Sequence, residues 1–595
     1  MIKLLKYMNN WAWGFIVLVI GLVVLQVYCD LELPTKLSNI LTSASTAEAL
    51  IDQGLMTDIL QKKYQDEIMK NGLEMFAYAG ISLFSSVLVC FFASRIASSF
   101  SYNLRKELYQ HIQKFSISEI ENFSTASLIT RTTNDITQIQ MVVIMTLRMA
   151  ISAPTMAVLG IIKAGNIEAS ANLSIIVVLS VVALVTLVVS LFLIVMPKFK
   201  AIQGLTDKLN LVTRENLTGI RVVRANCAEE YQENKFNEVN QKVTKTNVFV
   251  NRALSLLNPG MMLIMNGTSL AILWVGAYLI NENPLFLGNV FGFQQITMMI
   301  VMAFMQLIMI FIMVPRGLVS AKRVREVFDI KPSIANLVSM EPVPEEQGTI
   351  AYEDVCFSYP NSNENVLDHI HFTANAGQTI AIIGSTGSGK SSLINLLPRF
   401  FDATEGVVKV DGRDVKTYDL KILRDKIAFI AQKALLFKGT IRSNLLYGKE
   451  DATEEEMWNA LKLAMAYDFV SSYPDGLNQA VAQGGSNFSG GQKQRLSIAR
   501  ALIKRPEIIV FDDSFSALDF KTDKILRNNL KDLDYNPTKI IVAQRIGTIM
   551  DADLILVLDK GKIVGQGTHK ELIERCSVYQ EIAYSQLSKE EIDHA

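Results

Sequence analysis

The hydrophobic and polar positions of the chain follow different patterns before and after Pro315. Before it, long apolar stretches alternate with polar intervals, and six stretches approach the roughly 20 residues that a helix needs to cross a bilayer. They lie near residues 11–28, 75–98, 141–163, 172–196, 254–280 and 288–314. This pattern predicts a membrane α-helical domain of six transmembrane helices, which we place at residues 1–330.

The polar intervals between these stretches predict the orientation of the chain. Residues 29–74 read as one long loop, whereas residues 99–140 and 197–253 are long polar segments. The last segment holds ten Lys or Arg residues, and cytoplasmic segments are enriched in positive charge. We therefore expect a multi-pass protein of the cell membrane with both long polar segments and both chain ends in the cytoplasm.

Composition narrows the class of partner. Hydrophobic residues make up 50% of the chain, too many for an ordinary soluble enzyme, so membrane lipid is an expected partner. The net charge of -1 and the lack of a long basic run predict no nucleic-acid partner. The five cysteines show no CxxC spacing, so we interpret them as reduced packing residues rather than a disulfide framework or a zinc site.

A second domain follows the membrane part. Strand-like runs at residues 379–384 and 507–513 alternate with helix-like stretches, which is typical of a soluble α/β domain. A segment with three prolines, residues 331–348, separates it from a charged helix that continues the last apolar stretch. We predict a linker at 331–348 and the α/β domain at 349–590.

The sequence "GSTGSGKSS" follows one of these strands and opens a helix, which matches the P-loop pattern G-x-x-x-x-G-K-[ST] in the context that the motif requires. Backbone N–H groups of such a loop face the phosphates of ATP, Lys390 reaches the β and γ oxygens, and Ser391 is placed to bind Mg²⁺. The residues expected to bind the nucleotide here are Gly384, Ser385, Thr386, Gly387, Ser388, Gly389, Lys390, Ser391 and Ser392.

A second motif, "NFSGGQKQRLSIARAL", lies about a hundred residues further on and directly precedes the strand 507–513. At this point the chain resembles the ATP-binding cassette (ABC) family, whose signature LSGGQ stands here as Phe488, Ser489, Gly490, Gly491 and Gln492. The resemblance covers the whole chain, because six helices ahead of one cassette are the layout of an exporter half-transporter. It implies a six-helix transmembrane domain fused to an α/β P-loop nucleotide-binding domain.

The resemblance assigns further residues to the ATP site. It implies that Tyr359 stacks on adenine, although an edge tyrosine that only packs is the alternative. Gln432 matches the glutamine that touches Mg²⁺, with a solvated strand end as the alternative, and Asp512 matches the metal-binding aspartate. Asp519 closes the "SALD" loop that faces a partner cassette. The implied metal ligands are therefore Ser391, Gln432 and Asp512, and residues 123–135 and 215–225 look like the two cytoplasmic coupling segments.

Two catalytic positions depart from the family pattern. Where the family has a Glu that polarises the attacking water and a His that contacts the γ-phosphate, this chain has Asp513 and Gln544. A carboxylate shortened by one methylene lies roughly 1.5 Å further back, beyond the geometry that general-base catalysis tolerates. Glutamine can donate a hydrogen bond but carries no positive charge. We expect a site that holds ATP and Mg²⁺ but hydrolyses slowly, with Asp513 acting as an ordinary alternative base as the competing interpretation.

An intact signature beside an impaired site predicts a particular partner. In the family, cassettes dimerise head to tail, so each ATP lies between the P-loop of one chain and the signature of the other. The chain therefore looks like the degenerate-site half of a bacterial heterodimeric multidrug exporter, which would export hydrophobic, drug-like or lipid-like small molecules. The alternative is an ATP-gated regulatory membrane protein, or a channel-like subunit, that pumps nothing.

The membrane half gives only weak signals about substrate. Residues 294–313 contain six methionines, whose flexible side chains suit an adaptable cavity, although helix packing or lipid contact explains them equally well. Arg148 is an ionisable residue in an apolar stretch and so a functional candidate, but a position at the membrane boundary accounts for it as readily.

Overall fold

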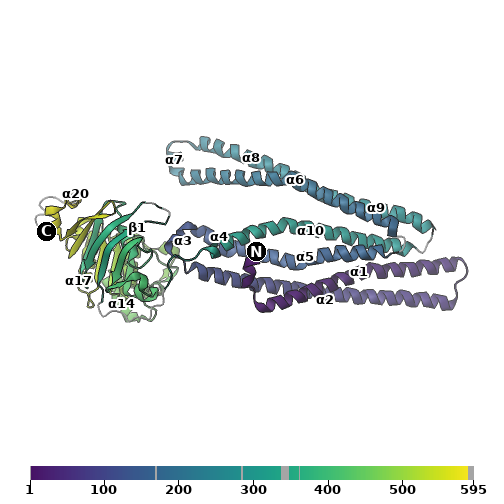
Figure 1. Cartoon of the computed structure of the whole chain (residues 1–595), viewed down its shortest axis with the longest axis horizontal. Helices are drawn as coiled ribbons and strands as arrows, with labels where there is room; N and C mark the ends of the chain where they lie inside the picture. The colour runs from purple at the N-terminus through teal and green to yellow at the C-terminus, as the bar shows by residue number, and fades with distance from the viewer. Residues whose placement is uncertain are drawn as a thin grey trace. The chain divides into compact units, whose positions relative to one another are not determined.

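The computed structural model describes residues 2–167, 170–282, 286–336, 347–360, 362 and 364–586. The chain divides into two compact units (Figure 1), one made of residues 1–113 and 126–329 and the other of residues 114–125 and 330–595. Most of the predicted linker, residues 337–346, lies outside the described residues.

The described part of the first unit consists of helices joined by short turns, and six of these helices are long and apolar enough to cross a membrane. This confirms the six-helix prediction. Its helices are α1 (Asn10–Asp52), α2 (Asp58–Ile112), α4 (Thr125–Thr130), α5 (Ile136–Gly165), α6 (Ser170–Thr218), α7 (Ile220–Ala225), α8 (Glu229–Ser255), α9 (Leu257–Glu282) and α10 (Phe286–Asp329).

The predicted long loop at residues 29–74 is wrong. Helix α1 continues to Asp52 and α2 begins at Asp58, so only a short turn connects them. Hydropathy marks the length of helix that suits lipid, whereas the helix itself continues wherever polar side chains are solvated or paired. Here the ion pair between Lys36 and Glu74, at 2.5 Å, joins the two helices beyond their apolar stretches.

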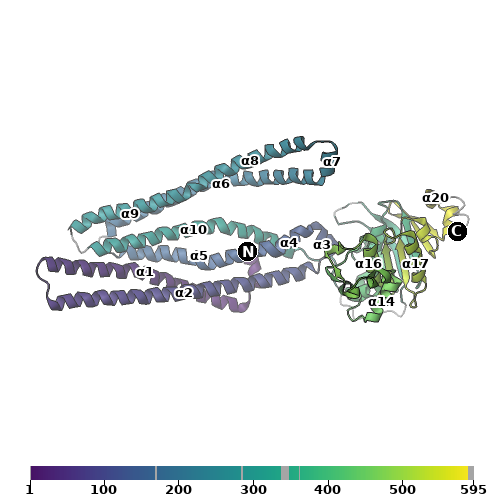
Figure 2. The same ribbon diagram turned by 180° about the vertical axis from the view of Figure 1, so that it is seen from behind.

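Two parts of the helical unit differ in how they pack. Helix α1 packs along α2, and α10 along α5, whereas α6 pairs with α8 and α9. Figures 1 and 2 show that α6 and α8, joined by the short α7, diverge from the other helices of the unit. Many large apolar side chains on this pair are exposed, among them Phe192 and Leu193 on α6 and Phe249 on α8.

The second unit is an α/β domain with two main sheets. One has the strand order β2-β1-β4-β5, and the other has the order β12-β11-β3-β10-β9-β6. In the larger sheet β11, β3, β10, β9 and β6 are parallel, and β12 is antiparallel to β11. The first-sheet strands are β1 (Ile350–Phe357), β2 (Leu367–Ala374), β4 (Glu405–Val410) and β5 (Arg413–Asp414). Those of the second are β3 (Thr379–Gly384), β6 (Ile427–Ile430), β9 (Ile508–Asp512), β10 (Thr538–Val542), β11 (Leu554–Asp559) and β12 (Lys562–Gly567).

The unit also contains eleven α-helices and the small strand pair β7 (Gly439–Thr440) and β8 (Ala480–Val481) among its described residues. The helices are α3 (Ile117–Asn122), α11 (Lys390–Leu396), α12 (Leu420–Lys426), α13 (Ile441–Leu445), α14 (Glu454–Leu463), α15 (Tyr467–Ser471), α16 (Gly490–Leu502), α17 (Phe520–Lys531), α18 (Ile546–Ile549), α19 (His569–Arg575) and α20 (Ser577–Tyr584). The predicted fold class, helical membrane domain plus α/β domain, is confirmed.

The apolar run of β3 explains why this strand lies at the centre of the domain. Ile380 and Ile382 pack into the core shared with the antiparallel sheet, whereas Ala381 and Ile383 pack into the core on the opposite face. Successive side chains of a strand point to opposite faces, so a continuous apolar run is required where both faces are covered. The strand therefore delivers the residues that follow it, starting at Gly384, to one fixed edge of the sheet.

A short segment of the N-terminal half belongs to the second unit. Residues 114–125, which include α3, group with the α/β domain. Glu119 caps α3 by accepting from the backbone N–H of Ser116 at 2.6 Å, and it also accepts from the N–H of Ser333 at 3.3 Å. Of the predicted coupling segment at residues 123–135, residues 123–125 group with the α/β domain and residues 126–135 with the helical unit, and its coupling role stays a prediction.

Candidate nucleotide site

The P-loop connects β3 to α11 with a backbone that requires glycine. Gly387 and Gly389 have φ values of 84° and 100°, and a Cβ on Gly389 would lie 2.9 Å from the carbonyl oxygen of Val366. Lys390 folds back over this loop, and its Nζ donates to the carbonyl oxygens of Gly384 at 2.8 Å and Ser385 at 2.7 Å. The ammonium group is therefore held above the loop whose N–H groups the motif assigns to phosphate.

The loop also contains a buried hydroxyl without a partner. The Oγ atom of Ser388 makes no hydrogen bond in the described structure although the residue is buried. Orphaned buried polar atoms are uncommon and point to a missing ion or ligand. Together with the ammonium of Lys390, this hydroxyl shows that the loop fits a bound phosphate group.

The expected Mg²⁺ ligands are partly brought together. The Oγ of Ser391 donates to Oδ1 of Asp512 at 3.2 Å, so two hard oxygen atoms of the kind that Mg²⁺ prefers lie side by side. Burial raises the pKa of the Asp512 carboxyl, and the charge of Asp513 adds to this rise, while Ser391 and Lys390 oppose it. Burial likewise lowers the pKa of Lys390. A bound Mg²⁺ would compensate the carboxylate charges that burial destabilises here.

Gln432, the third expected metal ligand, makes a different contact. Its Nε2 donates to Oδ2 of Asp513 at 3.0 Å, and Nε2 of Gln544 donates to the same oxygen at 2.8 Å. Asp513 is buried and adopts a left-handed backbone, with φ of 47°. The two amides therefore hold one carboxylate oxygen between them.

This three-residue arrangement was not predicted from the sequence. Gln432, Asp513 and Gln544 follow β6, β9 and β10, which are neighbours in the parallel sheet. Carboxyl ends of parallel strands meet at one edge, where such folds bind ligands. The polar residues that end each strand are visible in the sequence, but the order of the strands that makes them neighbours is not.

Tyr359 lies at the margin of the core next to the P-loop. Its hydroxyl is 3.0 Å from Oγ of Ser392, and its ring makes edge contacts with Phe357 and Phe401. The residue is half-buried. An aromatic ring that is only partly buried beside the loop suits stacking of a base.

The signature residues, 488–492, form contacts apart from the P-loop. Phe488 is buried in the core, while Ser489 caps α16 by accepting from the N–H of Gln492 at 3.3 Å, and the Gln492 side chain accepts from the N–H of Ser489 at 2.9 Å. Among the described residues, no hydrogen bond or ion pair joins them to the P-loop. Gly490 is exposed with open space where a Cβ would lie, and Gly491 lies close to the carbonyl oxygen of Ala517.

Asp519 likewise caps a helix in this chain. It accepts from the N–H of Thr522 at 2.9 Å and from its hydroxyl at 2.7 Å, which begins α17, and the first of these bonds lowers its pKa most. One chain therefore brings together the P-loop, Asp512, Asp513, Gln432 and Gln544. It presents Ser489, Gly490 and Asp519 at other exposed positions.

A P-loop α/β domain fused to six apolar helices defines an ATP-driven membrane transporter. The family described as ABC transporter transmembrane region matches residues 37–304, and the family described as ABC transporter matches residues 367–516. An ABC transporter ATP-binding protein of Mycobacterium tuberculosis is 40% identical over 77% of this chain and 79% of its own length. The chain therefore belongs to the ABC transporters, as an ATP-driven exporter subunit and a multi-pass membrane protein.

Two further comparisons are informative. An ATP-dependent lipid A-core flippase of Desulfotalea psychrophila is 36% identical over 63% of this chain and 65% of its own length. The structure of a bacterial Atm1-family ABC exporter with ATP bound superimposes with a TM-score of 0.78 and covers 98% of this chain and 100% of that chain, at 23% identity. At that identity the superposition shows the fold alone.

Proposed function

We propose that this chain is the slow-hydrolysis half of a heterodimeric exporter. Its own P-loop site holds ATP and Mg²⁺, and its signature completes the hydrolytic site of a second ABC half-transporter. ATP binding brings the two cassettes together, and hydrolysis at the partner's P-loop separates them. The chain ends and cassette lie in the cytoplasm, as the positive charge of residues 197–253 indicates.

The observation that carries this proposal is that the Asp513 carboxylate already accepts hydrogen bonds from two side chains. A general base must accept a proton from a water molecule within hydrogen-bond reach. Oδ2 of Asp513 already accepts from the amides of Gln432 and Gln544. The side chain is also short, so it cannot reach outward without breaking these bonds. Gln544, the second altered position, supplies no charge toward a developing phosphate.

The residues that hold ATP are complete by contrast. Lys390, Ser391 and Asp512 lie at the P-loop in contact with one another or with the loop backbone. The triphosphate supplies the phosphoryl group when bound, and these residues hold and orient it. Retention of the nucleotide without rapid turnover follows from this division.

The exported compound is a small hydrophobic, drug-like or lipid-like molecule. The flippase among the relatives acts on a lipid, and the exposed side chains of Met302 and Met309 give α10 a flexible apolar surface. Arg148 is exposed on α5, so it remains a candidate for contact with a polar group.

Co-expression with candidate ABC half-transporters tests the proposal. We expect a stable complex with a half-transporter that carries Glu and His at the positions equivalent to Asp513 and Gln544. This complex should hydrolyse ATP at least about tenfold faster than the single chain. Vigorous ATP hydrolysis by the purified single chain, abolished by Lys390→Ala, would contradict it.

A further inference from the structure

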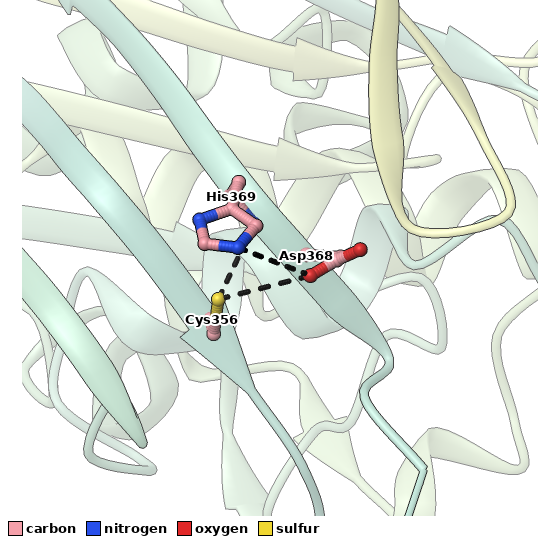
Figure 3. A group of neighbouring side chains, drawn as sticks. All are labelled: Cys356, Asp368 and His369. Carbon is pink, nitrogen blue, oxygen red and sulfur yellow. Dashed lines mark hydrogen bonds and ion pairs between the residues drawn. The ribbon is translucent and has the colours of Figure 1, made fainter.

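A second cluster of chemically reactive side chains lies on the antiparallel sheet of the cassette. Cys356 on β1 and Asp368 and His369 on β2 offer one ligand atom each, and these atoms all lie within 4.8 Å of one another (Figure 3). Cys356 Sγ is 3.9 Å from Oδ1 of Asp368, and Nε2 of His369 is 3.8 Å from the same oxygen. None of the three belongs to the nucleotide site described above.

An irregularity in strand pairing brings the three residues to one place. Val355 pairs with Ile370 and Phe357 with Leu367, so two residues of β2 lie opposite the single residue Cys356. In a regular strand, adjacent residues point to opposite faces. A bulge removes this alternation, which allows both Asp368 and His369 to approach the sulfur.

Neighbouring residues contact each of the three side chains and fix how its ligand atom lies. Nδ1 of His369 is 2.7 Å from Oδ1 of Asp354, and because an ionised carboxylate only accepts, Nδ1 carries the hydrogen of this bond and Nε2 is the nitrogen left to face a metal. A carboxylate behind a histidine in this way is the usual support of a metal-bound imidazole. The backbone N–H of His369 donates to Sγ of Cys356 at 3.3 Å and so holds the sulfur beside β2. Lys562 pairs with Oδ2 of Asp368 at 3.0 Å and leaves Oδ1 on the side of the cluster.

We propose that Cys356, Asp368 and His369 bind a zinc ion, with water as the fourth ligand. Tetrahedral zinc with bonds of about 2.0 to 2.3 Å separates neighbouring ligand atoms by roughly 3.4 to 3.6 Å. Closure therefore needs shifts of a few tenths of an ångström at the Sγ–Oδ1 and Nε2–Oδ1 distances, and the sulfur and the imidazole nitrogen, which lie within 4.8 Å of each other, must also approach. A thiolate and an imidazole select zinc over Mg²⁺, which prefers oxygen ligands. The thiol proton of Cys356 passes to solvent as the sulfur–zinc bond forms.

Bound zinc would join β1 to the edge strand β2 close to the adenine-side tyrosine. Tyr359 lies three residues beyond Cys356 along the same chain segment. The rule that zinc sites show paired cysteines misses this site, because its ligands come from two strands and only one is a cysteine. An ion that binds the folded state alone also stabilises it.

The test uses the full-length chain in detergent, purified without a histidine tag and kept reduced with a phosphine. Excess Mg²⁺ is present to occupy oxygen-only sites. Co²⁺ serves as a spectroscopic probe because a thiolate ligand gives a near-ultraviolet charge-transfer band, and Zn²⁺ competition gives the affinity. We expect one equivalent of Co²⁺ with this band, displaced by one equivalent of Zn²⁺.

Substitutions show which residues bind the metal ion. Cys356→Ser should remove the band, and His369→Ala should weaken Zn²⁺ binding at least about tenfold. Asp354→Asn, which affects the support of the imidazole, should weaken it by about 10- to 100-fold. His371→Ala, two residues further along the same strand, and Cys227→Ser, at an exposed cysteine, are matched controls that should change neither. A band that survives Cys356→Ser, loss of the band in Cys227→Ser, or no Co²⁺ binding with this band would overturn the proposal.

Discussion

The P-loop has the residues that its motif requires for phosphate binding, whereas the strand ends that face it carry Asp513 and Gln544 in place of the family's Glu and His. In the loop, Lys390 is held by two backbone carbonyls and Ser391 contacts Asp512. At the strand ends, Asp513 is enclosed by the amides of Gln432 and Gln544. Binding of phosphate needs fixed N–H groups and positive charge, whereas hydrolysis needs a base that can reach water. On the proposed function, the difference teaches that a cassette can keep the first property while it loses the second.

The largest effect should come from the signature of this chain, because on the proposed function it serves the partner's nucleotide. Ser489→Arg should lower ATP hydrolysis by the assembled pair about 10²- to 10³-fold, the usual cost of losing one donor to developing charge. Steady-state phosphate release measures this, with co-elution as the check on assembly. Ser486→Arg, at an exposed residue just before the motif, is the control and should have little effect. Equal loss in both variants would show a structural defect instead.

The next effect concerns the P-loop. Lys390→Ala in the single chain should weaken ATP binding by about 10- to 100-fold, since a hydrogen bond to a charged group contributes about 1.5 to 3 kcal/mol. Equilibrium binding of a fluorescent ATP analogue measures it. Lys438→Ala provides an exposed lysine of the same domain as the control. Unchanged affinity in Lys390→Ala would mean that the P-loop does not hold the phosphates.

A third experiment restores the family's Glu and His at the two altered catalytic positions. The double change Asp513→Glu and Gln544→His should raise ATP hydrolysis at this chain's own P-loop at least about tenfold, because a positioned general base contributes about 10² to 10⁴. The gain is measured in a pair whose partner P-loop lysine is replaced, so that only one nucleotide site is active. If the repaired chain hydrolyses ATP no faster, residues other than these two limit the reaction.

The sequence predicted the fold better than the site. Continuous apolar runs identified the six membrane helices and the central strand β3, because burial on both faces or contact with lipid leaves a direct pattern. The extension of α1 to Asp52 was missed, since polar residues in a helix outside lipid resemble a loop. The contact of Gln432 with Asp513 was also missed. It depends on β6 and β9 being neighbours, which pattern along one chain does not encode.

The smallest expected effect tests the central claim most directly. Asp513→Asn in the assembled pair keeps the size of the side chain and removes its ability to act as a base. If this site only holds ATP, phosphate release by the pair should change by less than about threefold, while Ser489→Arg in the same pair nearly abolishes it. A loss from Asp513→Asn that equals or exceeds the loss from Ser489→Arg would show that this chain carries its own working catalytic site.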